Sequence, residues 1–211
     1  MDTTYFHRFF GVMVWRDVHH KQNLLRKFLP YETIAAYKEG IEFLEMIGWK
    51  VKAIVCDGRR GLLQGFSCPI QMCHFHQAAI VTRYVTRRPL LEAGQDLQSL
   101  VRNLPIVDEA QFTQWLGLWE NKWGKFLKER TIDAVTGRWH YTHRRIRSAY
   151  YSVKRNLPYL FTYLRYPHLN IPNTTNSLEG IFTHLKKNMH LHGGLRFDQK
   201  KPMIEEFLQS L

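Results

Sequence analysis

Three carboxylates occupy positions where a side chain can take part in ligand binding. Asp57 directly follows residues 51–56, an apolar segment typical of a buried parallel strand. Ligands of open α/β sheets collect at the carboxyl ends of strands, although an Asp-Gly pair also makes an ordinary turn. Asp2 alone is typical of a solvated terminal residue, and Glu179 could form a capping box with Asn176. Each carboxylate therefore has a structural explanation when it is taken singly.

Two cysteines and two histidines lie close together beyond this strand end. Cys73 and His76 form a Cys-x-x-His pair at the end of a strand expected over residues 70–73. A zinc site would combine them with Cys68 and His74, but Cys68 and Cys73 are five residues apart and no second pair follows. We therefore do not expect zinc. The open alternatives are a pair that lines the ligand site and a buried structural pair.

The chain is strongly basic. Its 211 residues include 30 Lys and Arg against 18 Asp and Glu, which gives a net charge of +12 and a pI of about 9.8. Such an excess favours polyanion partners, since each neutralised phosphate releases condensed counterions; the alternative is an ordinary basic protein. A helix expected over residues 138–165 carries Arg144, Arg145 and Arg147 and is the first candidate for binding DNA.

The chain shows no signal for export or membrane insertion. No apolar run approaches the roughly 20 residues that span a bilayer, and Asp2 stands where a signal peptide would carry positive charge. Cys56, Cys68 and Cys73 are odd in number and close in sequence, which argues against a disulfide framework and for a reducing compartment. The sequence predicts a cytoplasmic protein without membrane contact.

The elements that must position these side chains form an α/β pattern. Short apolar, β-prone segments predict strands at residues 9–15, 23–29, 51–56 and 70–73. Between the second and the third, apolar residues recur at spacings of three and four from Thr33, and Gly48 ends that helix. We expect a mixed sheet with crossover helices, in one core that can carry an insertion.

A helical region interrupts this pattern at residues 77–165. Its aromatic stripe at helical spacing comprises Phe112, Trp115, Leu116, Trp119, Trp123, Phe126 and Leu127. We expect this stripe to be core, and not a base-stacking platform, because helical apolar faces usually bury. We interpret the region as an all-helical insertion between the two parts of the α/β core, residues 1–76 and 166–211.

The last part of the core contains a helix with Asn176 as its expected N-cap. Its apolar face comprises Leu178, Phe182, Leu185 and Met189, and its opposite face comprises Glu179, Thr183, Lys186 and His190. This pattern places one carboxylate in line with basic groups on a surface that faces solvent.

Taken in order, four segments resemble the DDE transposases of bacterial insertion sequences, in the Mutator-like superfamily. The segments are DTTYF from Asp2, CDGRRGL from Cys56, QMCHFHQ from Gln71 and NTTNSLE from Asn173, followed by Lys186 and Lys187. Each motif is weak alone, but four in this order, with a helical insertion before the glutamate, are specific. The similarity covers nearly the whole chain.

The resemblance implies a ribonuclease-H-like α/β fold with an all-α insertion before the last catalytic helix. Asp2, Asp57 and Glu179 would be catalytic and would bind two Mg²⁺ ions, with Mn²⁺ as a substitute, because hard carboxylate oxygens suit these ions. Two metals about 3.5–4 Å apart activate the attacking oxygen, first water and then a DNA 3′-hydroxyl, and stabilise the leaving oxygen. Cys73 and His76 match a Cys/Asp-x-x-His signature of the superfamily and would support the site.

The resemblance also implies DNA as the partner. Transposon ends and target DNA would be bound by a homo-oligomer in the active complex. The candidate DNA-binding residues are Arg144, Arg145, Arg147, Lys186, Lys187 and His190.

The chain departs from the family pattern at its start. In the family an apolar half-strand and a DNA-end-binding region precede the first aspartate, whereas only Met1 precedes Asp2. We therefore expect a truncated chain that binds DNA and cleaves it poorly. The alternatives are a non-catalytic DNA-binding transposase remnant and a ribonuclease-H-like nuclease unrelated to transposition. The helical insertion and the Cys-x-x-His pair argue against the last.

Overall fold

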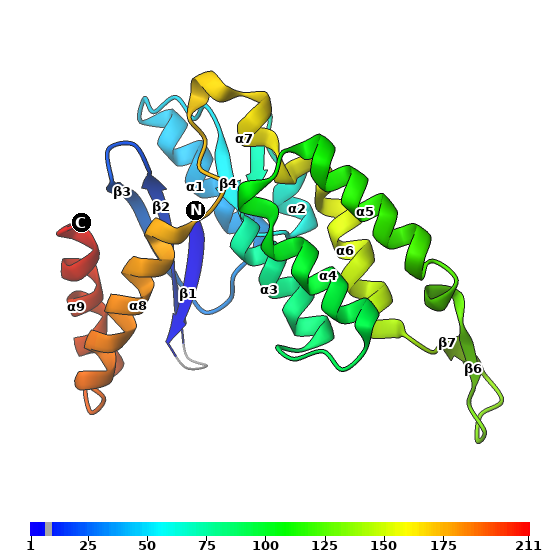
Figure 1. Cartoon of the computed structure of the whole chain (residues 1–211). Helices are drawn as coiled ribbons and strands as arrows, with labels where there is room; N and C mark the ends of the chain where they lie inside the picture. Colours follow the sequence, from blue (N-terminus) through cyan, green and yellow to red (C-terminus); the bar gives the residue numbers. More distant parts are fainter. Residues whose placement is uncertain (7–9) are drawn as a thin grey trace. The chain divides into compact units, whose positions relative to one another are not determined.

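The chain divides into two compact units. A computed structural model describes residues 1–6 and 10–211, with the backbone alone at Phe197. The first unit comprises Met1–Ile70 and Thr174–Leu211, and the second comprises Gln71–Asn173 (Figure 1). The expected insertion, residues 77–165, falls within the second unit.

The order of the elements is a mixture of strands and helices. In the described ranges the strands are β1 (Asp2–Phe6), β2 (Phe10–Asp17), β3 (Gln22–Leu29), β4 (Ile54–Cys56), β5 (Ile70–Met72), β6 (Arg130–Ile132) and β7 (Trp139–Tyr141). The α-helices are α1 (Ile34–Met46), α2 (Arg60–Leu63), α3 (His74–Val85), α4 (Glu92–Arg102), α5 (Glu109–Trp123), α6 (Arg144–Leu160), α7 (Thr162–Arg165), α8 (Asn176–Leu191) and α9 (Phe197–Gln209). Short 3₁₀ helices are η1 (Leu104–Ile106), η2 (Phe126–Lys128) and η3 (Pro167–Leu169). The predicted mixed α/β class is confirmed.

The sheet of the first unit brings two of the predicted acidic residues to one edge. β1, β2 and β3 are antiparallel neighbours, and Asp2 lies opposite Val14 in β2. The backbone nitrogen of Met1 donates a hydrogen bond to the carbonyl oxygen of Val55 in β4 at 3.0 Å. Asp2 and Asp57 each lie within two residues of this bond, so the start of β1 and the end of β4 are adjacent.

Helices cover both faces of this sheet. On one face, Phe6, Val12 and Val14 belong to a buried cluster with apolar residues of α8 and α9. On the other face, Trp15 packs edge-on against Tyr37 of α1, with ring centroids 6.1 Å apart. Figure 1 shows α8 running along β1, with α9 beside α8. The first unit is therefore a helix–sheet–helix sandwich, in which the alternation of β1 and β2 decides what each side chain faces.

The second unit is built on helices α3 to α6, and the aromatic stripe lies in its core. Phe112, Leu116 and Trp119 are buried, and Trp119 stacks on Tyr150 of α6 at a centroid distance of 5.0 Å. The Trp119 indole N–H also donates to the carbonyl oxygen of Ala93. The prediction that the stripe is core, and not a platform for bases, is confirmed.

The expectation of an all-helical insertion is wrong. β6 and β7 pair as an antiparallel hairpin, and α6 begins at Arg144, six residues after the expected start of that helix. The turn forms because the Asp133 carboxylate accepts hydrogen bonds from the amides of Val135 and Thr136, and Gly137 adopts a φ of 65°. Trp139 and Tyr141 then favour a strand. The helix was expected from the basic and aromatic residues of this stretch, and the turn residues Asp133 and Gly137 before it were not taken into account.

Other boundaries also differ from the expectation. The strand expected at residues 51–56 is shorter, since β4 begins at Ile54, and Phe9, expected at the start of a strand, lies outside the described residues. The N-cap of α8 is Thr175 and not Asn176. Cys56, Cys68 and Cys73 form no disulfide within the described residues. No helix among the described residues has the length and apolar composition needed to cross a membrane.

Gly40 sets the close approach of α1 to the sheet, because a Cβ atom there would lie 2.1 Å from Cζ2 of Trp15. We predict that Gly40→Ala destabilises the protein by about 1–3 kcal/mol, the cost of overpacking a closed core. Gly180 in α8 is the matched control, since its Cβ would meet open space. Gly180→Ala should stabilise by about 0.5–1 kcal/mol. Urea unfolding measures both, and a Gly40→Ala protein as stable as the wild type would contradict this packing.

Candidate functional site

Two of the predicted catalytic residues meet in the first unit. Asp2 begins β1 and shares its buried face with Phe6, and Glu179 lies in the first turn of α8, next to buried Leu178. Carboxylate oxygens of Asp2 and Glu179 lie within 4.8 Å of each other. The buried residues of α8 are Leu178, Phe182, Leu185 and Met189, as its apolar spacing predicts. This stripe docks the helix on the sheet and so directs Glu179 toward the start of β1.

The capping box considered for Glu179 does not form. The helix starts at Asn176 behind the N-cap Thr175, whose side chain makes no capping hydrogen bond. Glu179 is therefore the fourth helical residue, whereas a capping box requires the third. Its position is explained by the docking of α8 and not by capping, and the carboxylate remains partly accessible.

Asp57 makes the turn that its Asp-Gly sequence allows and stays partly exposed. One carboxylate oxygen accepts the backbone N–H of Arg59 at 3.0 Å, which is the turn expected of an Asp-Gly pair. The other lies 3.2 Å from Nε of the same arginine. The side chain is 23% exposed, so Asp57 is held in place and still reaches the surface.

A fourth carboxylate, Glu32, belongs to the same neighbourhood. Its side chain is only 9% exposed and forms an ion pair with the guanidinium of Arg59. The Tyr37 hydroxyl donates to Glu32 at 2.6 Å and also lies 2.8 Å from Oγ1 of Thr3. A continuous chain of polar contacts therefore runs from Thr3, next to Asp2, through Tyr37, Glu32 and Arg59 to Asp57.

The charges of this neighbourhood act on one another. Burial raises the pKa of Glu32 above its ordinary value, the hydrogen bond from Tyr37 and the charge of Arg59 oppose the rise, and the carboxylates of Asp57 and Asp2 add to it. Burial and the bond to Glu32 raise the pKa of the Tyr37 hydroxyl, which therefore stays protonated and keeps donating. Asp2, Glu32 and Asp57 thus share one electrostatic environment, in which Arg59 pairs with Glu32 and Asp57.

The sequence gives no direct signal for Glu32. Glu32 precedes Thr33, the N-cap of α1, and its local sequence indicates only a loop residue. Its ion-pair partner Arg59 lies 27 residues further along the chain. Only the packing of α1 against β1 and the turn after β4 bring these groups together.

The predicted supporting pair lies at the start of α3 in the second unit. Cys73 is the N-cap of α3 and is fully buried, and His76 lies in the first turn, half-buried, with its ring edge-on to Phe75. The intervening His74 is used in packing, since its Nε2 lies 2.6 Å from the carbonyl oxygen of Leu160 and burial lowers the pKa of its ring. Burial also raises the pKa of the Cys68 thiol, which disfavours the thiolate that zinc needs.

The predicted DNA-binding arginines have different surroundings. Arg144 is exposed at the first position of α6. The Arg145 guanidinium donates to the carbonyl oxygens of Tyr84 and Arg83, at the end of α3, so it fixes the helix end. Arg147 lies over the ring of Tyr141 at 3.9 Å. In the first unit, Lys186, Lys187 and His190 are exposed on α8.

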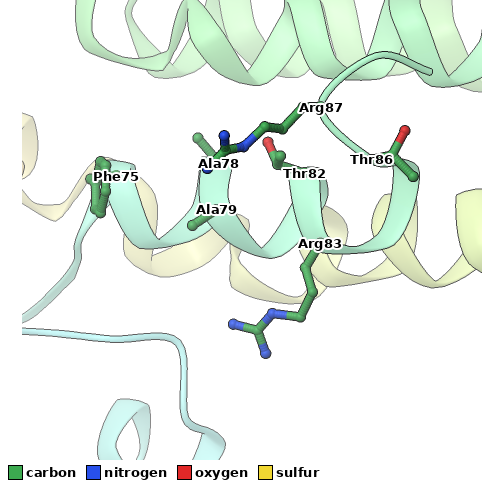
Figure 2. Close-up of a pocket in the computed structure, with 7 residues that line it drawn as sticks. All are labelled: Phe75, Ala78, Ala79, Thr82, Arg83, Thr86 and Arg87. Carbon is green, nitrogen blue, oxygen red and sulfur yellow. The ribbon is translucent and has the colours of Figure 1, made fainter. Parts of the chain in front are cut away.

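An open groove of about 570 Å³ lies along α3. Its lining, shown in Figure 2, comprises Phe75, Ala78, Ala79, Thr82, Arg83, Thr86 and Arg87. The lining carries two arginines and no carboxylate, so the groove favours anions. None of the predicted catalytic residues lines it.

No protein-family model, curated protein or solved structure matches this chain.

The raised pKa of Glu32 predicts how stability depends on pH. A carboxyl with a raised pKa in the folded state stabilises the protein below its ordinary pKa, and this contribution is lost as pH rises through the folded value. Glu32→Gln cannot ionise, so its free energy of unfolding relative to the wild type should increase as pH rises from 4 to 8. Urea titrations of both proteins measure this difference. A constant difference, or one that falls with pH, would contradict the raised pKa.

Proposed function

We propose that this chain is the catalytic core of a DDE-type DNA transposase, which cleaves and joins DNA strands by metal-dependent phosphodiester chemistry. The observation that carries the proposal is the convergence of Asp2 and Glu179, whose carboxylate oxygens lie within 4.8 Å although 177 positions separate them in the chain. Such convergence brings together like charges, which costs free energy unless a cation offsets it.

The arrangement of the strands supports a ribonuclease-H-like core. β1 is the edge strand of the β1–β2–β3 sheet, and Met1, the residue before it, bonds to Val55 of β4. Helices lie on both faces of that sheet, and the three acidic residues lie on the first strand, after the fourth strand and on a late helix. This is the placement that the resemblance implies.

The donor set suits Mg²⁺ or Mn²⁺. Mg²⁺ takes oxygen ligands at about 2.0–2.1 Å, so two ligands of one ion lie roughly 3–4 Å apart, and carboxylate oxygens of Asp2 and Glu179 lie within 4.8 Å of each other. Asp2, Glu179 and Asp57 would hold the metal, and Glu32 would add its charge through its coupling to Asp57 and Asp2. When bound, Mg²⁺ would polarise a phosphoryl oxygen and stabilise the leaving oxygen.

The chain's own residues have three tasks in this proposal. Asp2 and Glu179 provide negative charge on rigid elements, a strand and a docked helix, so their geometry is fixed before substrate binds. Arg59 holds Asp57 and Glu32 and offsets their repulsion. Cys73 and His76 remain a predicted supporting pair on the sequence resemblance alone.

We predict that the metal stabilises the folded chain. At a Mg²⁺ or Mn²⁺ concentration ten times the Kd, binding to the native state contributes about 1.4 kcal/mol, which corresponds to a rise in Tm of about 3–6 °C for a chain of this size. Glu179→Gln should remove this response, since it removes a carboxylate that the proposal assigns to the metal. Glu206→Gln, at an exposed position of α9, is the control and should keep the response. Potassium chloride at equal ionic strength separates binding from screening.

We also predict that Asp57→Asn and Glu179→Gln each reduce Mg²⁺- or Mn²⁺-dependent DNA nicking at least about 100-fold, while DNA binding stays within about twofold. Each change keeps the shape of the side chain and removes a metal-neutralising charge. The assay uses supercoiled plasmid with protein in excess, and fluorescence anisotropy measures binding.

The matched controls for this assay are Asp198→Asn and Glu206→Gln, which make the same chemical changes at exposed positions of α9. They should nick like the wild type. Nicking by the double variant Asp57→Asn, Glu179→Gln at the wild-type rate would refute the assignment. So would a wild-type chain that binds DNA but does not cleave it when either Mg²⁺ or Mn²⁺ is present.

A further inference from the structure

The β6–β7 hairpin is a surface element of the second unit with almost no core of its own. All three residues of β6 are exposed, and Trp139 at the start of β7 is 53% exposed. Figure 1 shows the hairpin extending beyond the ends of α5 and α6. A two-stranded hairpin is only marginally stable in water unless other contacts hold it. The contacts that stabilise this hairpin therefore show which side chains it holds at the surface.

Those contacts are a ladder of arginines and aromatic rings. The guanidinium of Arg130 lies over the ring of Trp139 at 4.1 Å and near that of Tyr141 at 5.7 Å. Arg147, from α6, lies over Tyr141 at 3.9 Å and over Tyr151 at 4.7 Å. The ladder therefore alternates cation and ring, and it ties the hairpin to α6.

Stacking of this kind leaves the hydrogen-bonding edge of an arginine available. A guanidinium packs on a ring through its face, while its five N–H donors lie in its plane. No side-chain hydrogen bond of Arg130 or Arg138 is found among the described residues. Stacking therefore presents the donors of Arg130 in a fixed orientation, which suits the oxygens of a phosphate, and Arg138 adds an exposed charge on the same hairpin.

The surroundings of the ladder are positively charged. The exposed basic residues around it are Lys125, Lys128, Arg130, Arg138 and Arg144. The two nearby acids have local partners: Glu129 lies 2.9 Å from His143, and the Asp133 carboxylate accepts amides of the turn. The positive charge of the hairpin is therefore not cancelled within it.

We infer that the β6–β7 hairpin binds the sugar–phosphate backbone of duplex DNA, with Arg130 and Arg138 as phosphate contacts. The choice of DNA rests on the proposed function. Duplex is favoured over single-stranded DNA because Trp139 and Tyr141 already stack on arginines, so stacking of these rings on unpaired bases would compete with those contacts. Binding through phosphates should tolerate any sequence.

The test measures binding of a 20-base-pair duplex, and of one of its strands, as a function of salt. For the double variant Arg130→Met, Arg138→Met, the slope of log K against log salt for the duplex should fall by about 2, since each lost phosphate contact removes about 0.9. The Kd at 0.1 M salt should rise about tenfold or more. Arg130→Lys, which keeps the charge but not the planar stack, should keep the slope.

Arg155→Met is the matched control, because it removes one exposed arginine from α6 outside the ladder. Circular dichroism and Tm must show that each variant is folded. An equal loss of slope in the control, a loss confined to the single strand, or an unchanged duplex slope in the folded double variant would overturn the inference. So would a dimer, detected by sedimentation, that Ile132→Ser and Val135→Ser abolish while duplex binding stays normal.

The two proposals fail separately in these experiments. If the wild-type chain nicks DNA and the double variant Arg130→Met, Arg138→Met keeps the salt dependence of duplex binding, only the hairpin inference is refuted. If the hairpin variants lose duplex binding, while the wild-type chain shows no response to metal and no nicking, only the catalytic proposal is refuted.

Discussion

Repulsion between carboxylates is the constraint around which the first unit is organised. Asp2 and Glu179 approach within 4.8 Å, and the charges of Asp2 and Asp57 reach Glu32 in its buried position. A fold can hold like charges together only if other contacts stabilise it by more than the repulsion costs. Here the sandwich of helices on the β1–β2–β3 sheet supplies that stability, and Arg59 pairs with Glu32 and Asp57.

The position of β1 connects these features. Its alternation turns Asp2 toward the side of α8 and Thr3 toward α1, where Thr3 contacts the Tyr37 hydroxyl. The same strand is bonded to β2 along its length and touches β4 at Met1. A one-residue change of register would reverse its faces and separate Asp2 from Glu179. The register of β1 is therefore as important to the candidate site as the acidic residues themselves.

The basic residues of the second unit show that charge has more than one use. Arg145 fixes the end of α3, whereas Arg130 and Arg147 stiffen a hairpin by stacking on aromatic rings. The partners in these contacts are carbonyl oxygens and aromatic rings, which do not neutralise the positive charge of the arginines. A surface that binds polyanions with preformed arginines loses less side-chain entropy on binding than one with free lysines.

The sequence by itself determined the elements whose spacing is strong. The apolar face of α8 followed from Leu178, Phe182, Leu185 and Met189, and the burial of Trp119 followed from the aromatic stripe, because a helix buries residues three and four apart. It also determined the net charge and the strand end before Asp57.

Only the tertiary structure decided the remaining features. Glu32 became part of the acidic neighbourhood through Arg59, a partner 27 residues away that no local pattern reveals. The N-cap of α8 is Thr175 and not Asn176, so Glu179 is one position too far into the helix to form a capping box. The stretch before Arg144 became a hairpin because Asp133 and Gly137 make a turn. Local spacing fixes which face of an element is apolar, whereas the contacts of a polar side chain depend on which distant elements pack beside it.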